Sequence, residues 1–252
     1  MVAASPNAQI ALIGCGMWGR NIARNLHQLG VLAGVCDQSD AAANDFAQTF
    51  ETKALSFPEI LNSPEINGVC IVTAAPSHAE LALQAFAAGK AVYVEKPLAL
   101  TVEDAEAMVT AAQKADKPLM VGHLIRHHAG FQELCHLVQS GDIGTLRHLR
   151  LSRIAPGRIR DSESVLFDLC PHDLALVAAL TDQATPSRVQ CHGFSHITQD
   201  IHDSVTAQLD FADGMTASIQ ANWLNPVKIH NLTVIGTTGA LVFDDTKPWA
   251  EK

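Results

Sequence analysis

The sequence lacks several features that would assign it to other classes of protein. Its 26 acidic residues outnumber 17 lysines and arginines, which gives a formal net charge of −9. Because nucleic-acid-binding surfaces neutralise phosphates with basic side chains, this charge argues against a general nucleic-acid-binding protein. Residues 1–7 lack the basic start and apolar core of a signal peptide. No apolar run reaches the roughly 18 residues of a membrane helix, so we expect a cytoplasmic protein.

The cysteine and histidine patterns predict neither a disulfide framework nor a metal site. The six cysteines are scattered without a C-x-x-C pair, which is typical of free thiols in a reducing compartment. Twelve histidines are many for this length, and His192 and His196 have ligand-like spacing. They fall in a predicted strand and turn, where residues four apart do not converge, and no third ligand lies beside them.

The first half of the chain alternates short β-rich runs with helical patterns, which is typical of βαβ units around a parallel sheet. Strands are predicted at Gln9–Ile13, Val31–Cys36, Gly68–Thr73, Ala91–Glu95 and Pro118–Gly122, and helices at Trp18–Leu29, Ala41–Phe50, Ser77–Ala88 and Val102–Ala115. The pattern predicts an α/β fold that begins with a doubly wound Rossmann domain over residues 1–122.

The second half, residues 123–252, predicts an α+β domain with a mostly antiparallel open sheet. Strands are predicted at Arg147–Arg153, Ser187–Gly193, Ser204–Phe211, Thr216–Trp223, Asn231–Ile235 and Ala240–Phe243, and helices at Phe131–Gln139 and Val165–Leu180. Two strands carry an alternating apolar stripe: Val205, Ala207 and Leu209, then Ile219, Ala221 and Trp223. We expect this stripe to be buried between subunits of a homo-oligomer.

A G-x-G-x-x-G motif follows the first predicted strand and opens the first predicted helix, the context in which this pattern is informative. Gly14 permits the tight turn, Gly16 lets a pyrophosphate approach the helix N-terminus, and Gly19 lets helix and strand pack closely. Asp37 closes the second strand, where a carboxylate can bond both ribose hydroxyls and would repel a 2′-phosphate. The motif therefore predicts NAD rather than NADP as the cofactor.

Two further segments carry residue types suited to acid–base chemistry. Lys96 follows the fourth predicted strand, at the carboxyl edge where open α/β sheets bind ligands. Asp168 and His172 lie four residues apart on one predicted helix and therefore share a face. Each residue taken singly also fits an ordinary structural role, such as a solvated lysine or a packing histidine.

Together these motifs resemble those of the Gfo/Idh/MocA family, whose members include glucose–fructose oxidoreductase and inositol dehydrogenase. The matching segments are the glycine-rich loop 14–19, Glu95-Lys96-Pro97, Val121-Gly122-His123 and the helix with Asp168 and His172. The resemblance implies that Lys96 and His172 form the catalytic pair, with Asp168 as a third polar residue. It also implies a Lys96–Pro97 bond that is often cis, and cofactor contacts from Met17, Trp18 and Glu95.

The implied chemistry suits these residue types. Oxidation of a sugar alcohol removes a hydroxyl proton while a hydride leaves the same carbon. Histidine has an unperturbed pKa near neutrality and can take the proton, and a lysine can stabilise the developing alkoxide. The family resemblance further implies a homodimer or homotetramer. Relatives usually continue beyond the equivalent of residue 252, so we expect the second domain to be incomplete at its C-terminal end.

The chain is most similar to the branch of UDP-N-acetylglucosamine (or its uronic acid) 3-dehydrogenases of surface-polysaccharide synthesis. Arg126, Arg158 and Arg160 lie in segments that suggest this branch. Five of the 17 lysines and arginines fall between residues 147 and 160 without an intervening acid. Such a cluster in an acidic protein is suited to a diphosphate or a carboxylate. It is also consistent with an exposed strand edge that is protected by charge.

Two alternative functions stay open at this point. The first is a dehydrogenase of a free sugar or an inositol, which would need no diphosphate site. The second is a regulator of the same fold that binds NAD or a sugar without catalysis, because fold alone does not determine function. Both Lys96 and His172 are present, which favours an enzyme.

Overall fold

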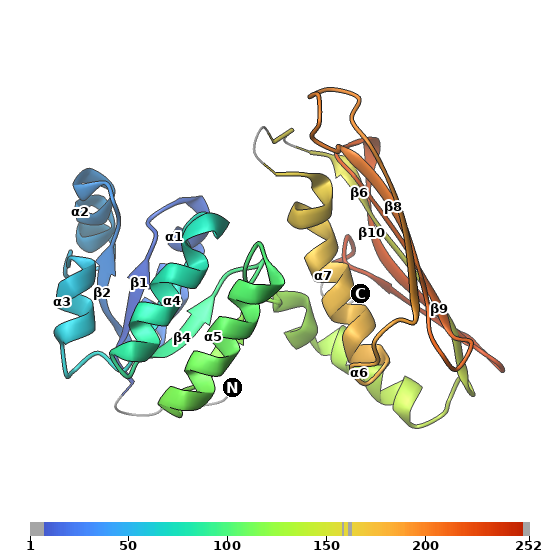
Figure 1. The fold of residues 1–252 in the computed structure, drawn as a ribbon, viewed down its shortest axis with the longest axis horizontal. Coiled ribbons are helices and arrows are strands. Elements are labelled where there is room, and N and C mark those ends of the chain that lie inside the picture. Colours follow the sequence, from blue (N-terminus) through green and yellow to red (C-terminus); the bar gives the residue numbers. More distant parts are fainter. Residues whose placement is uncertain (1–7, 158, 161–162, 249–252) are drawn as a thin grey trace. The chain divides into compact units, whose positions relative to one another are not determined.

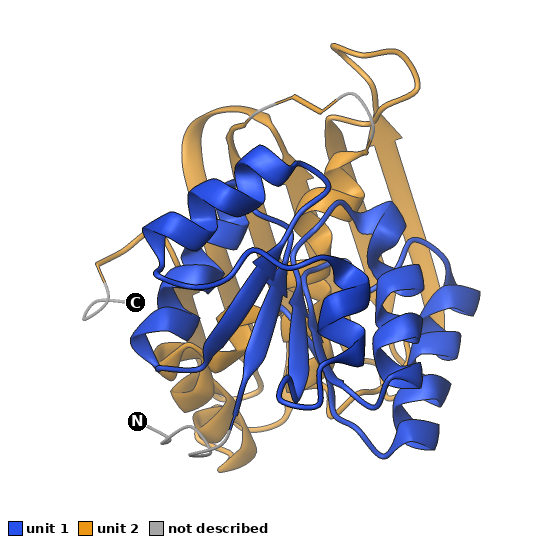
Figure 2. Cartoon of the chain, turned by 90° about the vertical axis from the view of Figure 1, so that its left-hand side faces the viewer, with its two compact units in different colours: residues 1–122 blue, residues 123–252 orange. Residues whose placement is uncertain are grey.

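The computed structural model describes residues 8–157, 159–160 and 163–248. The chain divides into two compact units, residues 1–122 and residues 123–252 (Figure 2). None of the helices in the described ranges is long and apolar enough to cross a membrane. All six cysteines are free thiols, as their spacing predicts.

The first unit is built on a five-stranded parallel sheet in the order β2-β1-β3-β4-β5 (Figure 1). The strands are β1 Ile10–Ile13, β2 Leu32–Cys36, β3 Gly68–Ile71, β4 Ala91–Val94 and β5 Leu119–Val121. Beyond β2, Ala54 forms an isolated parallel bridge with Val35, where a further edge strand would lie. This sheet confirms the predicted doubly wound Rossmann domain.

Helices cover both faces of this sheet. Successive strand residues point to opposite faces, so Leu12 packs with α1 and α2, whereas Ala11 and Ile13 pack with α3, α4 and α5. The helices are α1 Met17–Gln28, α2 Asp40–Thr49, α3 Phe57–Asn62, α4 His78–Ala87 and α5 Val102–Ala115, with a 3₁₀ turn η1 at Ala75–Ser77. Both faces are therefore closed, and ligands can approach the sheet only at its strand ends.

The short helix α3 is not predicted by the helical pattern of the sequence. It begins with a capping box, in which the Ser56 hydroxyl accepts a hydrogen bond from the backbone N–H of Glu59. In return, the Glu59 carboxylate accepts a bond from the backbone N–H of Ser56 at 2.7 Å. Six residues are too few to display helical periodicity, whereas the Ser-x-x-Glu start is visible in the sequence.

The second unit is built on a six-stranded sheet in the order β11-β10-β6-β9-β8-β7. Strands β6 and β9 pair in parallel, and the other neighbouring pairs of described strands are antiparallel. The strands are β6 Leu146–Pro156, β7 Arg188–Phe194, β8 Ser204–Asp210, β9 Thr216–Asn222, β10 Leu224–Gly236 and β11 Ala240–Asp244. This arrangement confirms the predicted mostly antiparallel open sheet.

Helices α6 (Ala129–Gln139) and α7 (Val165–Leu180) lie on one face of this second sheet, after a 3₁₀ turn η2 at Leu124–His127 (Figure 1). Phe131 of α6 and Leu176 of α7 pack with Leu149 of β6 and Ile219 of β9 in one apolar core. The sheet therefore has a covered face, toward the helices, and an outer face.

The apolar stripe that we expected between subunits faces this core instead. Its members are at most 8% exposed: Val205, Ala207, Leu209, Ile219, Ala221 and Trp223. The alternate positions of the same strands carry Thr206, Gln208, Ser218 and Gln220, so the outer face is polar there. The stripe is thus no argument for assembly, because α7 already buries it. A homodimer or homotetramer stays a prediction of the family resemblance alone.

A buried ion pair joins α7 to β6. Arg153 and Asp173 are 6% and 2% exposed, and Arg153 Nη2 and Nε lie 2.9 and 3.0 Å from Asp173 Oδ1. His230 of β10 brings its Nδ1 to within 3.5 Å of Arg153 Nη1. Burial and the neighbouring Arg153 cation lower the pKa of His230 to about 4, which favours the neutral imidazole beside the guanidinium.

We predict that Arg153→Met lowers the free energy of unfolding by about 3–5 kcal/mol, because it leaves the Asp173 carboxylate buried without its cation. The double variant Arg153→Met/Asp173→Leu should regain most of this loss, since both charges are then absent. Urea unfolding measures both effects. The control is Arg20→Met, whose exposed pair with Asp45 should contribute no more than about 1 kcal/mol. Equal losses in Arg153→Met and Arg20→Met would contradict the prediction.

Candidate functional site

The turn after β1 has the geometry of a dinucleotide-binding turn. Gly14 has a φ of +106°, and a Cβ there would lie 2.5 Å from the carbonyl oxygen of Val72. A Cβ at Gly19 would collide with the carbonyl oxygen of Gly14, so α1 packs directly on the turn. Gly16 caps α1, no described atom lies within 4 Å of its Cβ position, and the next residue, Met17, is 86% exposed. The first N–H groups of α1 therefore face space that an anion can enter.

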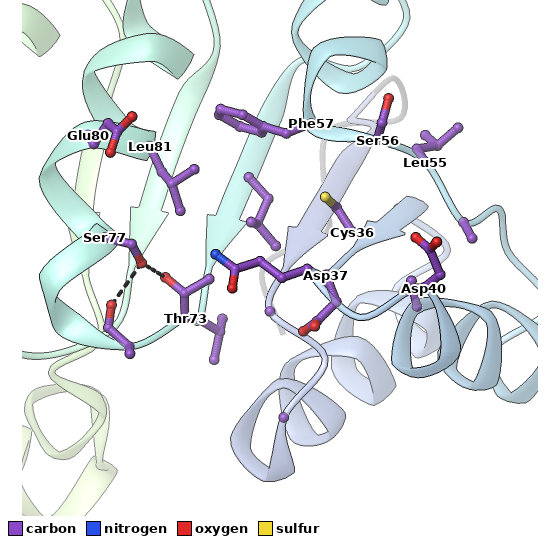
Figure 3. A pocket seen from close by; sticks show the side chains of 18 of the residues that line it. Cys36, Asp37, Asp40, Leu55, Ser56, Phe57, Thr73, Ser77, Glu80 and Leu81 are labelled. Atoms are coloured by element: carbon purple, nitrogen blue, oxygen red, sulfur yellow. Dashed lines mark hydrogen bonds between the residues drawn. The ribbon is translucent and has the colours of Figure 1, made fainter.

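A groove of about 1030 Å³ extends from this turn over the carboxyl ends of β2 and β3 (Figure 3). Asp37 lines it, and its Oδ2 and Oδ1 accept hydrogen bonds from the backbone N–H groups of Cys15 at 2.7 Å and Ser39 at 2.9 Å. These bonds hold the carboxylate at the edge where the ribose of a dinucleotide binds. None of the described residues that line the groove is a lysine or arginine, whereas Asp37, Asp40 and Glu80 are acidic.

The rest of the groove also fits a dinucleotide. Its lining includes the apolar side chains of Leu55, Phe57 and Leu81, which suit an adenine ring (Figure 3). Thr73 and Ser77 share a hydrogen bond of 2.7 Å between β3 and α4, on the same side of the groove as Leu81 (Figure 3). The open helix start, the acidic ribose edge and the apolar lining together fit NAD, and the acidic edge disfavours a 2′-phosphate.

Glu95 and Lys96 follow β4 at the same edge of the sheet. The Glu95 carboxylate is buried and accepts hydrogen bonds from Trp18 Nε1 at 2.6 Å, from the Tyr93 hydroxyl at 2.6 Å and from the backbone N–H of Lys96 at 3.2 Å. Lys96 is partly buried, and its peptide bond to Pro97 is cis. Hydrogen bonds to Glu95 therefore connect Trp18 and Lys96, residues that the sequence analysis predicted from separate motifs.

His78 belongs to this region, although the sequence did not single it out. It is 1% exposed, and its Nδ1 and Nε2 lie 2.9 and 3.1 Å from the carbonyl oxygens of Pro97 and Thr73. The imidazole thus links the loop that carries Lys96 to the loop that lines the groove. In a sequence, a histidine at a helix start cannot be distinguished from an ordinary core histidine.

In the second unit, Asp168 and His172 lie one turn apart on α7. Asp168 is 9% exposed; its Oδ2 accepts a hydrogen bond from Trp223 Nε1 at 3.1 Å, and its Oδ1 from Arg160 Nη2 at 3.4 Å. His172 is partly buried. Trp223, which we expected at an apolar interface, is therefore a polar anchor of the candidate catalytic carboxylate.

The arginines between residues 147 and 160 do not form a single anion site. Arg153 is buried in its ion pair with Asp173 and is not available to a ligand. Arg150 is exposed on the opposite face of β6, because strand residues three apart point to different faces. Arg150 and Arg153 therefore cannot contact one anion together, and Arg126, Arg158 and Arg160 stay the predicted substrate-binding arginines.

Of the three predicted substrate-binding arginines, Arg160 reaches the candidate site in the second unit. Besides its bond to Asp168, its Nε lies 3.7 Å from Glu163 Oε1. Arg126 is exposed in η2. Arg158 lies outside the described residues. Arg160 thus has two acidic neighbours, and its side chain is still 41% exposed.

Among the described residues, no group of three His, Cys, Asp or Glu side chains converges on a metal-binding position. His192 is exposed on β7, and His196 has its Nδ1 2.7 Å from Asp203 Oδ1. The Asp203 carboxylate also accepts bonds from the backbone N–H groups of His196 and Ile197, which organise the loop between β7 and β8.

Comparisons with known protein families match both units. Residues 8–123 match the model described as "Oxidoreductase family, NAD-binding Rossmann fold", and residues 131–242 match the "GFO/IDH/MocA C-terminal domain". The first unit is therefore an NAD-binding Rossmann domain, as its glycine-rich turn and Asp37 predicted. The second match covers all the strands of the second sheet except the end of β11.

Individual relatives include dehydrogenases with different substrates. The chain is 34% identical over 212 residues to the UDP-N-acetylglucosamine 3-dehydrogenase of Acidithiobacillus ferrooxidans, over 84% of this chain and 66% of that protein. It is 35% identical over 142 residues to inositol 2-dehydrogenase 3 of Saccharopolyspora erythraea, over 54% of this chain and 42% of that protein. The chain thus spans at most about two thirds of the length of these two relatives.

Solved structures share the fold of this chain. A structure of UDP-N-acetylglucosamine 3-dehydrogenase GnnA from Acidithiobacillus ferrooxidans matches with a TM-score of 0.86 at 30% identity, over 94% of this chain and 76% of that one. GenD2 from gentamicin A biosynthesis, solved in complex with NAD, matches with a TM-score of 0.89 over 95% of this chain and 73% of that one. At 24% identity, the second likeness shows the fold alone.

We predict that Asp37→Ala weakens NAD binding about ten- to a hundredfold, which corresponds to the loss of charge-assisted hydrogen bonds. The preference for NAD over NADP should also shrink, because the charge that repels a 2′-phosphate is gone. Titration of both cofactors measures the two effects. The control is Asp45→Ala, a carboxylate on α2 that pairs with Arg20 and does not line the groove. An unchanged NAD/NADP ratio would remove Asp37 from this role.

Proposed function

Because the chain belongs to the Gfo/Idh/MocA family of oxidoreductases, we propose that it oxidises a secondary hydroxyl group of a sugar by hydride transfer to NAD. The substrate that we propose is a UDP-linked amino sugar or its uronic acid, oxidised at C3. One observation carries the catalytic part of the proposal. Trp223 and, through a longer contact, Arg160 hold the Asp168 carboxylate one turn before His172, so an acid–base pair lies on one face of α7.

Each candidate residue has a distinct task in this proposal. NAD, when bound, supplies the hydride acceptor. His172 takes the hydroxyl proton as the O–H and C–H bonds break and the carbonyl forms, and Lys96 donates a hydrogen bond to the developing alkoxide. Asp168 contributes a negative charge near His172, which stabilises the imidazolium that the proton transfer creates. Met17 and Trp18, in the first turn of α1, and Glu95 complete the cofactor side.

Arg160 supports the sugar-nucleotide form of the substrate. Its guanidinium lies beside Asp168 and remains 41% exposed, so some of its five N–H donors are available to a diphosphate or a carboxylate. The 34% identity to a UDP-N-acetylglucosamine 3-dehydrogenase over 84% of the chain favours the same class of substrate. Inositol 2-dehydrogenase 3 is similarly identical over a shorter stretch, so a free-sugar or inositol dehydrogenase is the second candidate.

Two further parts of the proposal concern the protein in the cell. We place it in the cytoplasm, because free thiols suit a reducing compartment. We also propose a homodimer or homotetramer that forms through the second unit. Light scattering across micromolar concentrations tests the assembly, and a monomer throughout that range would reject it.

We predict that Lys96→Ala and His172→Ala each lower turnover by on the order of 10² to 10⁴ while NAD stays bound. The assay mixes the purified protein and NAD with UDP-linked sugars, free sugars and inositol, and follows nicotinamide absorbance. The exposed residues Lys114 and His136 provide matched controls, and their alanine variants should keep wild-type rates. Near-native turnover in either site variant would reject its assignment. Bound NAD without turnover of any sugar would favour the non-catalytic regulator.

We predict that Arg160→Ala raises the KM for a UDP-sugar about ten- to a hundredfold, the cost of one charge-assisted hydrogen bond. The KM for the matching free sugar and the affinity for NAD should change little. Arg188→Ala, on the exposed edge strand β7, controls for a general loss of positive charge. Equal effects of Arg160→Ala on the KM for both substrates, or no change in either KM, would favour a free-sugar or inositol dehydrogenase.

A further inference from the structure

The buried Glu95 carboxylate connects three segments of the first unit. In the described part of the chain it accepts bonds from Trp18 in α1, from Tyr93 in β4 and from the backbone of Lys96 in the following loop. We propose that Glu95 is a positioning residue, which fastens the glycine-rich turn to the Lys96 loop and so couples NAD binding to the placement of Lys96. The effect on turnover rests on the proposed function, whereas the effect on NAD binding does not.

The space around this carboxylate is shaped to hold it in one place. A Cβ at Gly122, directly after β5, would lie 2.6 Å from the Tyr93 hydroxyl oxygen and 2.8 Å from Glu95 Oε2. The backbone N–H of Gly122 donates to the carbonyl oxygen of Val94 at 2.8 Å, which keeps the end of β5 against β4. Position 122 therefore has to lack a side chain for Glu95 to occupy its present position.

The donors around Glu95 require a carboxylate. Trp18 and Tyr93 both donate to Oε1, and the Lys96 backbone donates to Oε2, so both oxygens accept. Burial and the neighbouring Glu95 raise the pKa of the Tyr93 hydroxyl, which keeps it protonated and able to donate. A glutamine at position 95 has a single acceptor oxygen, and its NH₂ group would face at least one of these donors. Bonds to a charged acceptor are also stronger than bonds between neutral groups.

Trp18 links the N-terminal turn of α1, which an anion can contact, to the Glu95 carboxylate. Trp18 is the second residue of α1, so its own backbone N–H belongs to the first-turn donors that an anion contacts. Its indole N–H is bonded at 2.6 Å to the same carboxylate that holds the Lys96 backbone. A pyrophosphate that orders the turn therefore also orders Glu95 and, through it, the start of the Lys96 loop.

A double-mutant cycle on NAD affinity tests the connection without any substrate. Trp18→Phe keeps an aromatic ring and removes the indole donor, and Glu95→Gln removes the charged acceptor. Each variant should raise the Kd for NAD about tenfold, as expected for one charge-assisted bond. The double variant should have a Kd for NAD no higher than that of the single variant with the higher Kd, because both changes break the same contact. If the two effects multiply instead, Trp18 and Glu95 act independently and the proposal is wrong.

Two further variants control this cycle for a general loss of negative charge and for misfolding of Glu95→Gln. Glu106→Gln removes an exposed carboxylate on α5 in the same unit and should leave the Kd unchanged. If Glu95→Gln does not fold, Glu95→Asp replaces it, because aspartate keeps the charge but withdraws the oxygens by one methylene group. The thermal midpoint of each variant is measured first, so that only folded proteins enter the cycle. Additive effects of Trp18→Phe and Glu95→Asp would overturn the proposal in the same way.

A second cycle tests whether Glu95 acts through Lys96. In the wild-type background, Glu95→Gln should lower kcat about tenfold at saturating NAD and leave the KM for the sugar unchanged, because it displaces a group rather than removing a substrate contact. In the Lys96→Ala background the same change should have little further effect on kcat. A full tenfold loss in both backgrounds would show that Glu95 does not act through Lys96. If the wild-type protein oxidises no sugar, the proposed function fails, and the NAD cycle still decides the role of Glu95.

Discussion

Burial of a carboxylate is favourable only if hydrogen-bond donors or a cation replace the water that it loses, and this constraint organises both units. The Glu95 carboxylate accepts hydrogen bonds from the Trp18 indole, the Tyr93 hydroxyl and the backbone N–H of Lys96. Asp173 is met by the Arg153 guanidinium, and Asp168 by Trp223 and Arg160. Glu95 directly precedes Lys96, Asp173 directly follows His172, and Asp168 lies one helical turn before His172. The donors therefore fix not only the acids but also the backbone next to them, which carries Lys96 in one unit and His172 in the other.

The parallel sheet explains why residues so far apart in the first unit meet. All its strands run in one direction, so the residues that follow them gather at one edge. Gly14 follows β1, Asp37 follows β2, Glu95 follows β4 and Gly122 follows β5. This edge could be predicted from the sequence, because four of the five strands, all except β3, are apolar runs that stop at a glycine or an acid. The helices on both faces leave it as the accessible side of the sheet.

Other features could not be predicted, for identifiable physical reasons. Alternation along β8 and β9 correctly predicts one buried face, but it does not say whether a helix or a second subunit covers that face. Trp18 and Glu95 are 77 residues apart and Trp223 and Asp168 are 55 apart, so these contacts depend on packing that no local pattern encodes. The arginine cluster is different. Its strand was predicted, and the two-residue period of a strand already separates Arg150 from Arg153.

The surroundings of Arg160 bear on how a substrate could use it. A guanidinium that contacts Asp168 at 3.4 Å and Glu163 at 3.7 Å is already partly neutralised, and both distances are too long for strong bonds. An incoming diphosphate would therefore compete with two carboxylates for the same cation rather than meet a free one. If the diphosphate displaces Asp168 from Arg160, Asp168 keeps only Trp223 of these two hydrogen-bond donors. The negative charge of Asp168 near His172 is then less compensated. Under the proposed function, such an exchange would link recognition of an anionic substrate group to the electrostatics at His172, the proposed proton acceptor. A neutral sugar or an inositol would leave the Arg160–Asp168 contact as it is.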